Sequence, residues 1–255
     1  MIRELEVFFA ALRFFTRLPV PSRVGHSQQQ LEQAARYLPL IGIIVGGIGA
    51  LVTVAAASWL PMSLAVLAGM AATLLVTGAF HEDGWADAAD GFGGGHDKGR
   101  VLEIMKDSRI GSFGAIAITL MLLAKFNALV QIDALGGPRT LAFALVAAHA
   151  LSRLAATTLI GVLDYAREDD NAKARALTRR PGAAELTVAA LFGLAPCLLL
   201  DGSRVWVAIA LVGAVTLLCA GYFVRRIGGY TGDCLGATQQ VAELAFYIGL
   251  LCASS

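Results

Sequence analysis

Long apolar segments recur along this chain and limit the folds it can adopt. Seven stretches are predominantly apolar, and most reach the roughly 20 residues that a helix needs to cross about 30 Å of hydrocarbon. The chain is 57% hydrophobic and only 15% charged, so it has too few charges to cover a water-exposed surface. The sequence therefore predicts an all-α fold, a polytopic integral membrane helical bundle. The predicted spans are residues 38–60, 62–80, 113–132, 140–163, 184–200, 205–224 and 241–253.

Of these predicted transmembrane helices, about seven in all, two match the pattern of a full span less well than the others. The fifth contains Pro196, and the seventh is short and contains Glu243. No soluble domain is inserted between the spans, so residues 1–255 are expected to form one membrane-embedded domain.

Basic residues indicate how the spans are oriented, because Lys and Arg in short loops stay on the cytoplasmic side. With the N-terminus inside, sixteen of the 20 Lys and Arg fall in inner segments, while the outer loops hold only Arg139 and Arg204. We therefore expect the N-terminus and the long inner loop, residues 81–112, to face the cytoplasm. The net charge of +1 gives no indication of a nucleic-acid partner.

Residues 1–37 precede the first span and begin with an amphipathic pattern. Large apolar residues recur at helical spacing from Leu5 to Phe15, with charged residues between them, which predicts an interfacial helix. Pro19 and Pro21 end this helix and leave Arg17 near the membrane surface. Its guanidinium is then placed to meet either a phosphate or a lipid head group.

An acidic run follows the second span. If the helix continues past the bilayer, Asp83, Asp87 and Asp90 fall at i, i+4 and i+7 on one face. Two like charges about 6 Å apart repel by roughly 3 kcal/mol at an effective dielectric near 20, which a divalent cation would offset. Magnesium takes one or two carboxylates together with substrate phosphates, so the run indicates a phosphorylated ligand as well. The alternative is a solvated acidic helix end.

Further charged residues follow in the inner loops. Lys106 and Arg109 lie one helical turn apart and are candidates for a diphosphate, while Asp107 between them could join the carboxylates. Ordinary cytoplasmic anchoring also explains these two cations. A second glycine-rich loop carries Asp233, a candidate ligand for a second ion.

Charged residues inside the predicted spans need an interior partner. Lys125 and Arg153 lie well inside two spans, and His149 precedes Arg153 by one helical turn. Lys or Arg at bilayer depth costs roughly 2.5 to 3.5 kcal/mol on insertion scales, so we expect these side chains to face the bundle interior.

Four motifs, in order along nearly the whole chain, resemble the cobalamin synthase family, whose members are adenosylcobinamide-GDP ribazoletransferases. They are F-x-T-R-L-P-V-P at 14–21, F-H-E-D-G-x-x-D-x-x-D-G at 80–91, E-I-M-K-D-S-R-x-G at 103–111 and T-G-D-x-L-G-A at 231–237.

The resemblance implies a Mg²⁺-dependent transferase in the bacterial inner membrane that completes the nucleotide loop of adenosylcobalamin. In such a reaction, adenosylcobinamide-GDP and alpha-ribazole, or its 5′-phosphate, give adenosylcobalamin, or its 5′-phosphate, and GMP. An alcohol then attacks a diphosphate, which needs charge neutralised on the transferring and departing groups.

On this basis we assign hypothetical roles to the candidate residues. The expected base is Asp90 or His81. Lys106 and Arg109 are expected to bind phosphate oxygens. Further candidates for substrate binding are Arg17, Arg153 and Lys125. The expected magnesium ligands are Asp83, Asp87, Asp90 and Glu82, assisted by Asp233 or Asp107.

Two other functions are compatible with parts of the sequence. The Asp-rich run is partly similar to that of CDP-alcohol phosphotransferases, although those continue with an Arg after the Ala where Asp87 stands here. A transporter is the second alternative, because of the charged residues at depth, but no internal repeat is evident. Expected partners are the two substrates and the lipid bilayer, with a homo-oligomer or association with other enzymes of the pathway left open.

Overall fold

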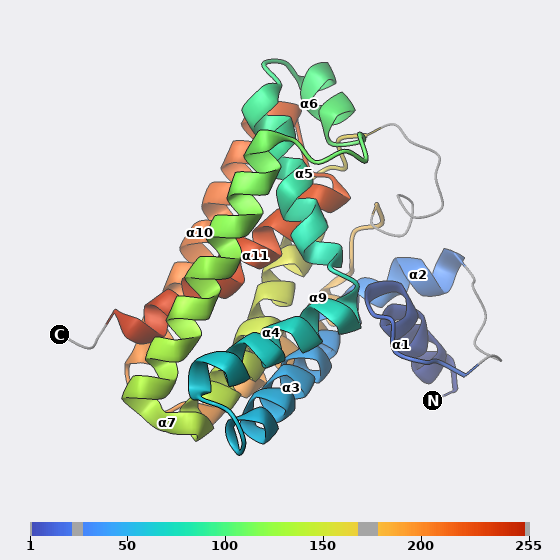
Figure 1. Cartoon of the computed structure of the whole chain (residues 1–255). Helices are drawn as coiled ribbons and strands as arrows, with labels where there is room; N and C mark the ends of the chain where they lie inside the picture. Colours follow the sequence, from blue (N-terminus) through green and yellow to red (C-terminus); the bar gives the residue numbers. More distant parts are fainter. Residues whose placement is uncertain (1, 22–27, 168–177, 253–255) are drawn as a thin grey trace.

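The computed structural model describes residues 2–21, 28–167 and 178–252, and these residues are helical, with one isolated β-bridge and no strand (Figure 1). Residues 22–27 of the N-terminal segment and the end of the last predicted span, from residue 253, lie outside this part. The helices are α1 (Ile2–Phe15), α2 (Gln28–Ala34), η1 (Ala35–Tyr37), α3 (Leu38–Ala57), α4 (Met62–Thr77), α5 (Phe80–Gly94), α6 (Lys98–Ile104), α7 (Ser112–Val162), α9 (Ala183–Leu194), η2 (Ala195–Leu199), α10 (Arg204–Ile227) and α11 (Gly232–Leu251).

Three of these segments are long and apolar enough to cross a membrane by themselves: Gln30–Ala57, α7 and α10. Within α7, Gly137 adopts φ 76° and ψ 176°, and Pro138 follows it, so the helix breaks there into two arms, 112–136 and 138–162. Figure 1 shows these arms running down and back up through the molecule. The break matches the boundary between two of the predicted spans.

By length and composition, three segments of the described residues could each cross a membrane, or four if α4 and α5 form one bent span, and a shorter apolar helix covers Ala183–Leu199. The chain turns by 86° between α4 and α5, because Gly78 and Ala79 both adopt left-handed backbone conformations, with φ of 67° and 57°. The fifth predicted span is a short helix, α9, that tightens at Pro196, and α11 is interrupted by polar residues. We treat α3, α7 and α10 as the membrane-spanning helices and α5 as lying outside them.

Residues 80–94 form helix α5, as the helical spacing of the acidic run requires, so the predicted inner loop 81–112 is a loop only in part. Its last carbonyls are held by Arg226 of α10, which donates to the carbonyl oxygen of Gly95 at 2.7 Å and to that of Phe92 at 3.2 Å. The turn before α5 is braced from the N-terminal segment, since the backbone N–H of Arg17 donates to the carbonyl of Val76 at 2.7 Å. Both ends of α5 are therefore fixed.

The N-terminal helix α1 is a packing helix as well as an amphipathic one. Val7, Ala11 and Phe15 are buried against α2 and the start of α3, while Leu5 is exposed. Arg36 of η1 donates to Glu4 of α1 at 2.8 Å.

Close helix contacts depend on glycine. A Cβ on Gly42 of α3 would overlap the backbone carbonyl of His149 in the second arm of α7, whereas a Cβ on Gly47 would meet nothing within 4 Å. Small residues at such crossings let two backbones approach closely, which is how helices associate inside a membrane.

We expect the substitution Gly42→Ala to destabilise the protein by about 1–3 kcal/mol, because the added methyl group forces α3 away from α7. The matched variant Gly47→Ala should keep or raise the melting temperature, since its methyl group enters open space. Thermal unfolding of both variants in detergent measures the difference. Equal melting temperatures for the two variants would contradict this packing.

Candidate active site

The candidate site lies where α5 crosses α11, and two glycines let the helices meet there. A Cβ on Gly84 would approach the Cα atom of Asp233 to 3.2 Å, and a Cβ on Gly236 would approach the Cα atom of Gly84 to 3.2 Å. The two backbones are therefore nearly in contact. This crossing sets Asp83 and Asp87, one turn apart on α5, beside Asp233 in the first turn of α11.

The carboxylates influence one another electrostatically. Burial first, and then the neighbouring carboxylates of Asp233, Asp83 and Asp90, together raise the pKa of Asp87 to about 7, against the opposing effect of Arg167. Asp83 is exposed and Asp87 is half-buried, so the group opens to one side. Asp83, Asp87 and Asp233 are therefore electrostatic neighbours, whereas the convergence of Asp83, Asp87 and Asp90 on one ion stays a prediction.

Arg167 reaches this group through a short backbone pairing that the sequence did not reveal. The N–H of Ala166 donates to the carbonyl of Tyr230 at 2.8 Å, and the N–H of Tyr230 donates to the carbonyl of Asp164 at 2.9 Å. The chain after α7 is thus tied to the chain before α11. Arg167 consequently forms an ion pair with Asp233, with 2.8 Å between Nη2 and Oδ2.

Asp90 has a structural role that we did not predict. Its two carboxylate oxygens accept the backbone N–H groups of Gly111 at 2.7 Å and Gly114 at 2.8 Å, so it caps the start of α7. A cap of this kind ties α5 to α7. The roles of Asp90 as metal ligand and as base stay predictions. A metal ion or a proton would have to compete with the two backbone N–H groups that its oxygens already accept.

Asp107 and Arg109 pair with each other away from the other carboxylates. Arg109 donates from Nη2 to Asp107 Oδ2 at 2.6 Å and from Nε to Oδ1 at 3.0 Å, and this hydrogen bonding lowers the pKa of Asp107 to about 2. The Arg109 side chain is 86% exposed. Lys106, in contrast, lines a pocket together with Arg167. Of the two predicted phosphate-binding cations, Lys106 is the one beside the site.

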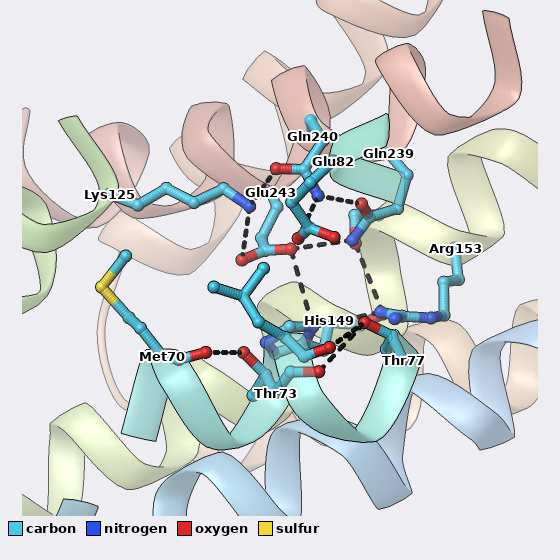
Figure 2. A network of polar contacts seen from close by, with 12 residues as sticks. Met70, Thr73, Thr77, Glu82, Lys125, His149, Arg153, Gln239, Gln240 and Glu243 are labelled. Carbon is cyan, nitrogen blue, oxygen red and sulfur yellow. Dashed lines mark hydrogen bonds and ion pairs between the residues drawn. The ribbon is translucent and has the colours of Figure 1, made fainter. Parts of the chain in front are cut away.

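A second polar group is buried in the bundle, on another side of α5 (Figure 2). Lys125 of the first arm of α7 forms an ion pair with Glu243 of α11 at 2.9 Å, and both side chains are about 5% exposed. Lys125 also donates to Gln240 at 2.7 Å, and Gln240 donates to Glu82 of α5 at 2.9 Å. We call these residues, with Gln239, His149 and Arg153, the buried network.

The second arm of α7 completes the buried network. Arg153 donates to the carbonyl oxygen of His149 at 2.9 Å, and His149 Nδ1 lies 3.6 Å from Glu243. The His81 ring is buried, and its electrostatic neighbours are Arg153, Glu243, His149 and Lys125. The expectation that charged residues at depth have interior partners is therefore confirmed.

The structure separates the predicted site residues into different places. Glu82, His81, Lys125 and Arg153 belong to or face the buried network, whereas Asp83, Asp87 and Asp233 meet at the α5–α11 crossing. Arg17 lies against Gly78 in the turn before α5. The predicted roles of Glu82, His81, Lys125, Arg153 and Arg17 at a phosphate or a metal stay predictions, and this arrangement does not support them.

The carboxylate group fits magnesium as an open site. No three acidic, His or Cys side chains among the described residues converge closely enough to hold an ion by themselves. Mg²⁺ is usually held by one or two carboxylates, with waters and substrate phosphates completing its shell. Asp83, Asp87 and Asp233 supply only hard oxygen donors, and their mutual repulsion, which adds to burial in raising the Asp87 pKa, is what a divalent cation would relieve.

Sequence reasoning missed Arg167, Lys98 and Gln240. In the sequence, Arg167 and Lys98 entered only the count of basic residues expected on the cytoplasmic side. Gln240 stands at the edge of a predicted apolar span. The spacing of Gln239, Gln240 and Glu243 along one helix was the signal that could have indicated a buried polar face.

The comparisons agree with the motifs. A family model described as cobalamin-5-phosphate synthase matches residues 7–251. The chain is 45% identical to the adenosylcobinamide-GDP ribazoletransferase of Shewanella frigidimarina, covering 98% of this chain and 95% of that one. It is 48% identical to the enzyme of that name from Ralstonia nicotianae, covering 92% and 90%, and 43% identical to that from Leptothrix cholodnii, covering 98% and 97%.

No solved structure matches the chain significantly. A family model over almost the whole sequence, together with relatives that align end to end, confirms the resemblance seen in the four motifs. The chain belongs to the cobalamin-5-phosphate synthase family.

Proposed function

We propose that this chain transfers the cobinamide phosphate of adenosylcobinamide-GDP to a ribose hydroxyl of alpha-ribazole or its 5′-phosphate, with release of GMP. The relatives carry the corresponding name. The observation that supports the proposal most directly is the group of three carboxylates at the α5–α11 crossing, flanked by Arg167 and Lys106. Carboxylates for a metal beside cations for phosphate are what phosphoryl transfer requires.

The bond changes assign a task to each part of the site. The hydroxyl oxygen forms a bond to the phosphorus that carries cobinamide, and the bond from that phosphorus to the bridging oxygen breaks, so GMP leaves with the electron pair. The proton of the hydroxyl passes to a base, for which Asp90 and His81 stay the predicted candidates. Magnesium held by Asp83, Asp87 and Asp233 would supply positive charge at the diphosphate.

Arg167 and Lys106 are proposed to bind oxygens of the same diphosphate. Arg167, which is held by Asp233, presents a planar fork of donors that suits phosphate oxygens, and Lys106 adds a second positive charge. Because Asp233 orients Arg167, the fork is in place before the substrate binds. Negative charge that develops on the departing GMP is thereby offset.

The site lies at one end of the bundle, near α6 and the start of α7 (Figure 1). We propose that this end faces the cytoplasm and that the bilayer is the bacterial inner membrane. The distribution of Lys and Arg along the sequence supports this orientation, because sixteen of the 20 fall in the segments expected to face the cytoplasm. Both nucleotide substrates would then reach the site from the cytoplasm.

The buried network favours the enzyme over the transporter. The cavity beside Lys125, His149 and Glu243 has a volume of about 20 Å³, which is room for about one water molecule. The charges at depth are thus packed against one another, so this network does not outline a route for a solute.

We expect Asp87→Asn to lower GMP release by at least about a hundredfold, because a neutral amide cannot hold the cation that faces the diphosphate. Turnover is measured with purified protein in detergent at saturating magnesium. Asp107→Asn is the matched control, since that carboxylate is paired with Arg109 in an exposed loop, and it should keep most of the activity. Near-normal turnover by folded Asp87→Asn protein would remove the metal assignment.

A stability variant distinguishes the buried network from the carboxylate group. Glu243→Gln leaves Lys125 buried without its counter-charge and should cost about 3–5 kcal/mol of unfolding free energy. Glu103→Gln breaks an exposed pair with Arg100 and should cost about 0–1 kcal/mol. Thermal unfolding in detergent reports both values, and Asp87→Asn should melt close to the wild type. A Glu243→Gln protein as stable as the wild type would show that the ion pair does not hold the bundle.

A further inference from the structure

A pocket of about 340 Å³ lies at the end of the bundle opposite the carboxylate group, and no step of the proposed reaction uses it. Helix α11 begins beside Asp233, and its other end, Leu251, lines this pocket. The pocket also includes residues on both sides of the break in α7. Figure 1 shows this turn of α7 on the side of the molecule away from α5 and α6.

Three charged side chains line the pocket: Arg139, Asp201 and Arg204. Arg139 follows the break in α7, and the other two flank the turn into α10. The two arginines are the only Lys or Arg residues that the sequence places in outer loops, and both line this one pocket. Within the described part of the chain, none of the three side chains forms a hydrogen bond or an ion pair, although the Arg139 guanidinium lies over the Phe143 ring at 5.4 Å. Two cations and an acid therefore share a pocket without neutralising one another.

Much of the remaining lining is apolar and exposed. Leu135 of the first arm of α7 and Leu199 of η2 are 56% and 48% exposed. Trp206, in the first turn of α10, is exposed on the outside of the bundle. An exposed Trp at the end of a membrane-spanning helix is typical of the membrane–water interface, where its ring lies at the level of the lipid headgroups. We therefore place the three charged residues at headgroup depth, with apolar surface next to them.

The charges of the pocket match a ligand that carries both signs. The planar guanidinium groups of Arg139 and Arg204 suit phosphate oxygens. Helix α10 begins here, and Ser203 makes no side-chain capping hydrogen bond, so the first turn keeps N–H donors for the same anion. Asp201 would repel a purely anionic ligand but accepts hydrogen bonds from an ammonium group. A phosphate joined to a primary ammonium therefore complements all three side chains.

We propose that this pocket binds the headgroup of phosphatidylethanolamine from the leaflet opposite the carboxylate group. The phosphate binds Arg139 and Arg204, the ammonium donates to Asp201, and the acyl chains follow the apolar wall at Leu135. Phosphatidylcholine has no N–H to donate, and phosphatidylglycerol has no cation for Asp201. The lining comes from both arms of α7, the start of α10 and the end of α11, so the bound lipid stabilises the place where they meet.

The test measures thermal unfolding of the full chain, purified in detergent, stripped of lipid and then given one phospholipid. Phosphatidylethanolamine should raise the melting temperature of the wild type by about 5 °C more than phosphatidylcholine does. Arg139→Gln and Arg204→Gln should each lose most of this difference, and Asp201→Asn should respond equally to the two lipids. Arg100→Gln is the matched control, because it breaks an exposed pair with Glu103 far from the pocket, and it should keep the full difference.

The three pocket variants remove no hydrogen bond or ion pair within the described residues, so they should fold, and circular dichroism checks this. Equal stabilisation of the wild type by phosphatidylcholine, or stronger stabilisation by phosphatidylglycerol, would show that the ammonium is not recognised. An unchanged response of the variants would show that the lipid acts elsewhere. Equal stabilisation by free phosphoethanolamine would assign the pocket to a water-soluble ligand. Each of these results overturns the proposal, and the comparison of lipids on the wild type needs no variant.

Discussion

The ion pair between Lys125 and Glu243 is the interaction on which the arrangement of this bundle depends. Both groups are almost fully buried between the first arm of α7 and α11, where neither charge is tolerated alone. Gln240 extends the pair to Glu82, so α5 is tied to the same point. Because a polar network satisfies its members only in one geometry, it fixes the rotation of α5 and α11 about their axes as well as their separation.

That fixed rotation is what places the chemistry. With Glu82 held inside, the next residue, Asp83, must point away from the network, and Asp87 follows it one turn later. The glycine contact between Gly84 and Gly236 then brings Asp233 alongside. One helix thus uses neighbouring residues for two purposes: one face carries the bonds that hold the bundle, and another carries the carboxylates that we assign to catalysis.

The sequence predicted what depends on local pattern and missed what depends on pairing at a distance. The apolar windows predicted the helices. The cost of placing charge inside the bilayer predicted that Lys125 and Arg153 face the bundle interior. Helical spacing placed Asp90 with Asp83 and Asp87, but it could not show that the Asp90 oxygens accept the amides of Gly111 and Gly114. It also could not foresee the left-handed pair at Gly78 and Ala79, which turns α5 by 86° from α4.

Arg167 shows why such a residue escapes pattern analysis. It belongs to no helix, and its place beside Asp233 depends on two backbone hydrogen bonds between segments more than sixty residues apart. These bonds need Gly229, because a Cβ there would overlap the carbonyl of Asp164. A glycine that reads as part of an ordinary loop therefore decides where a cation stands. The same contact sets Arg167 between Asp233 and the pocket that Lys106 also lines.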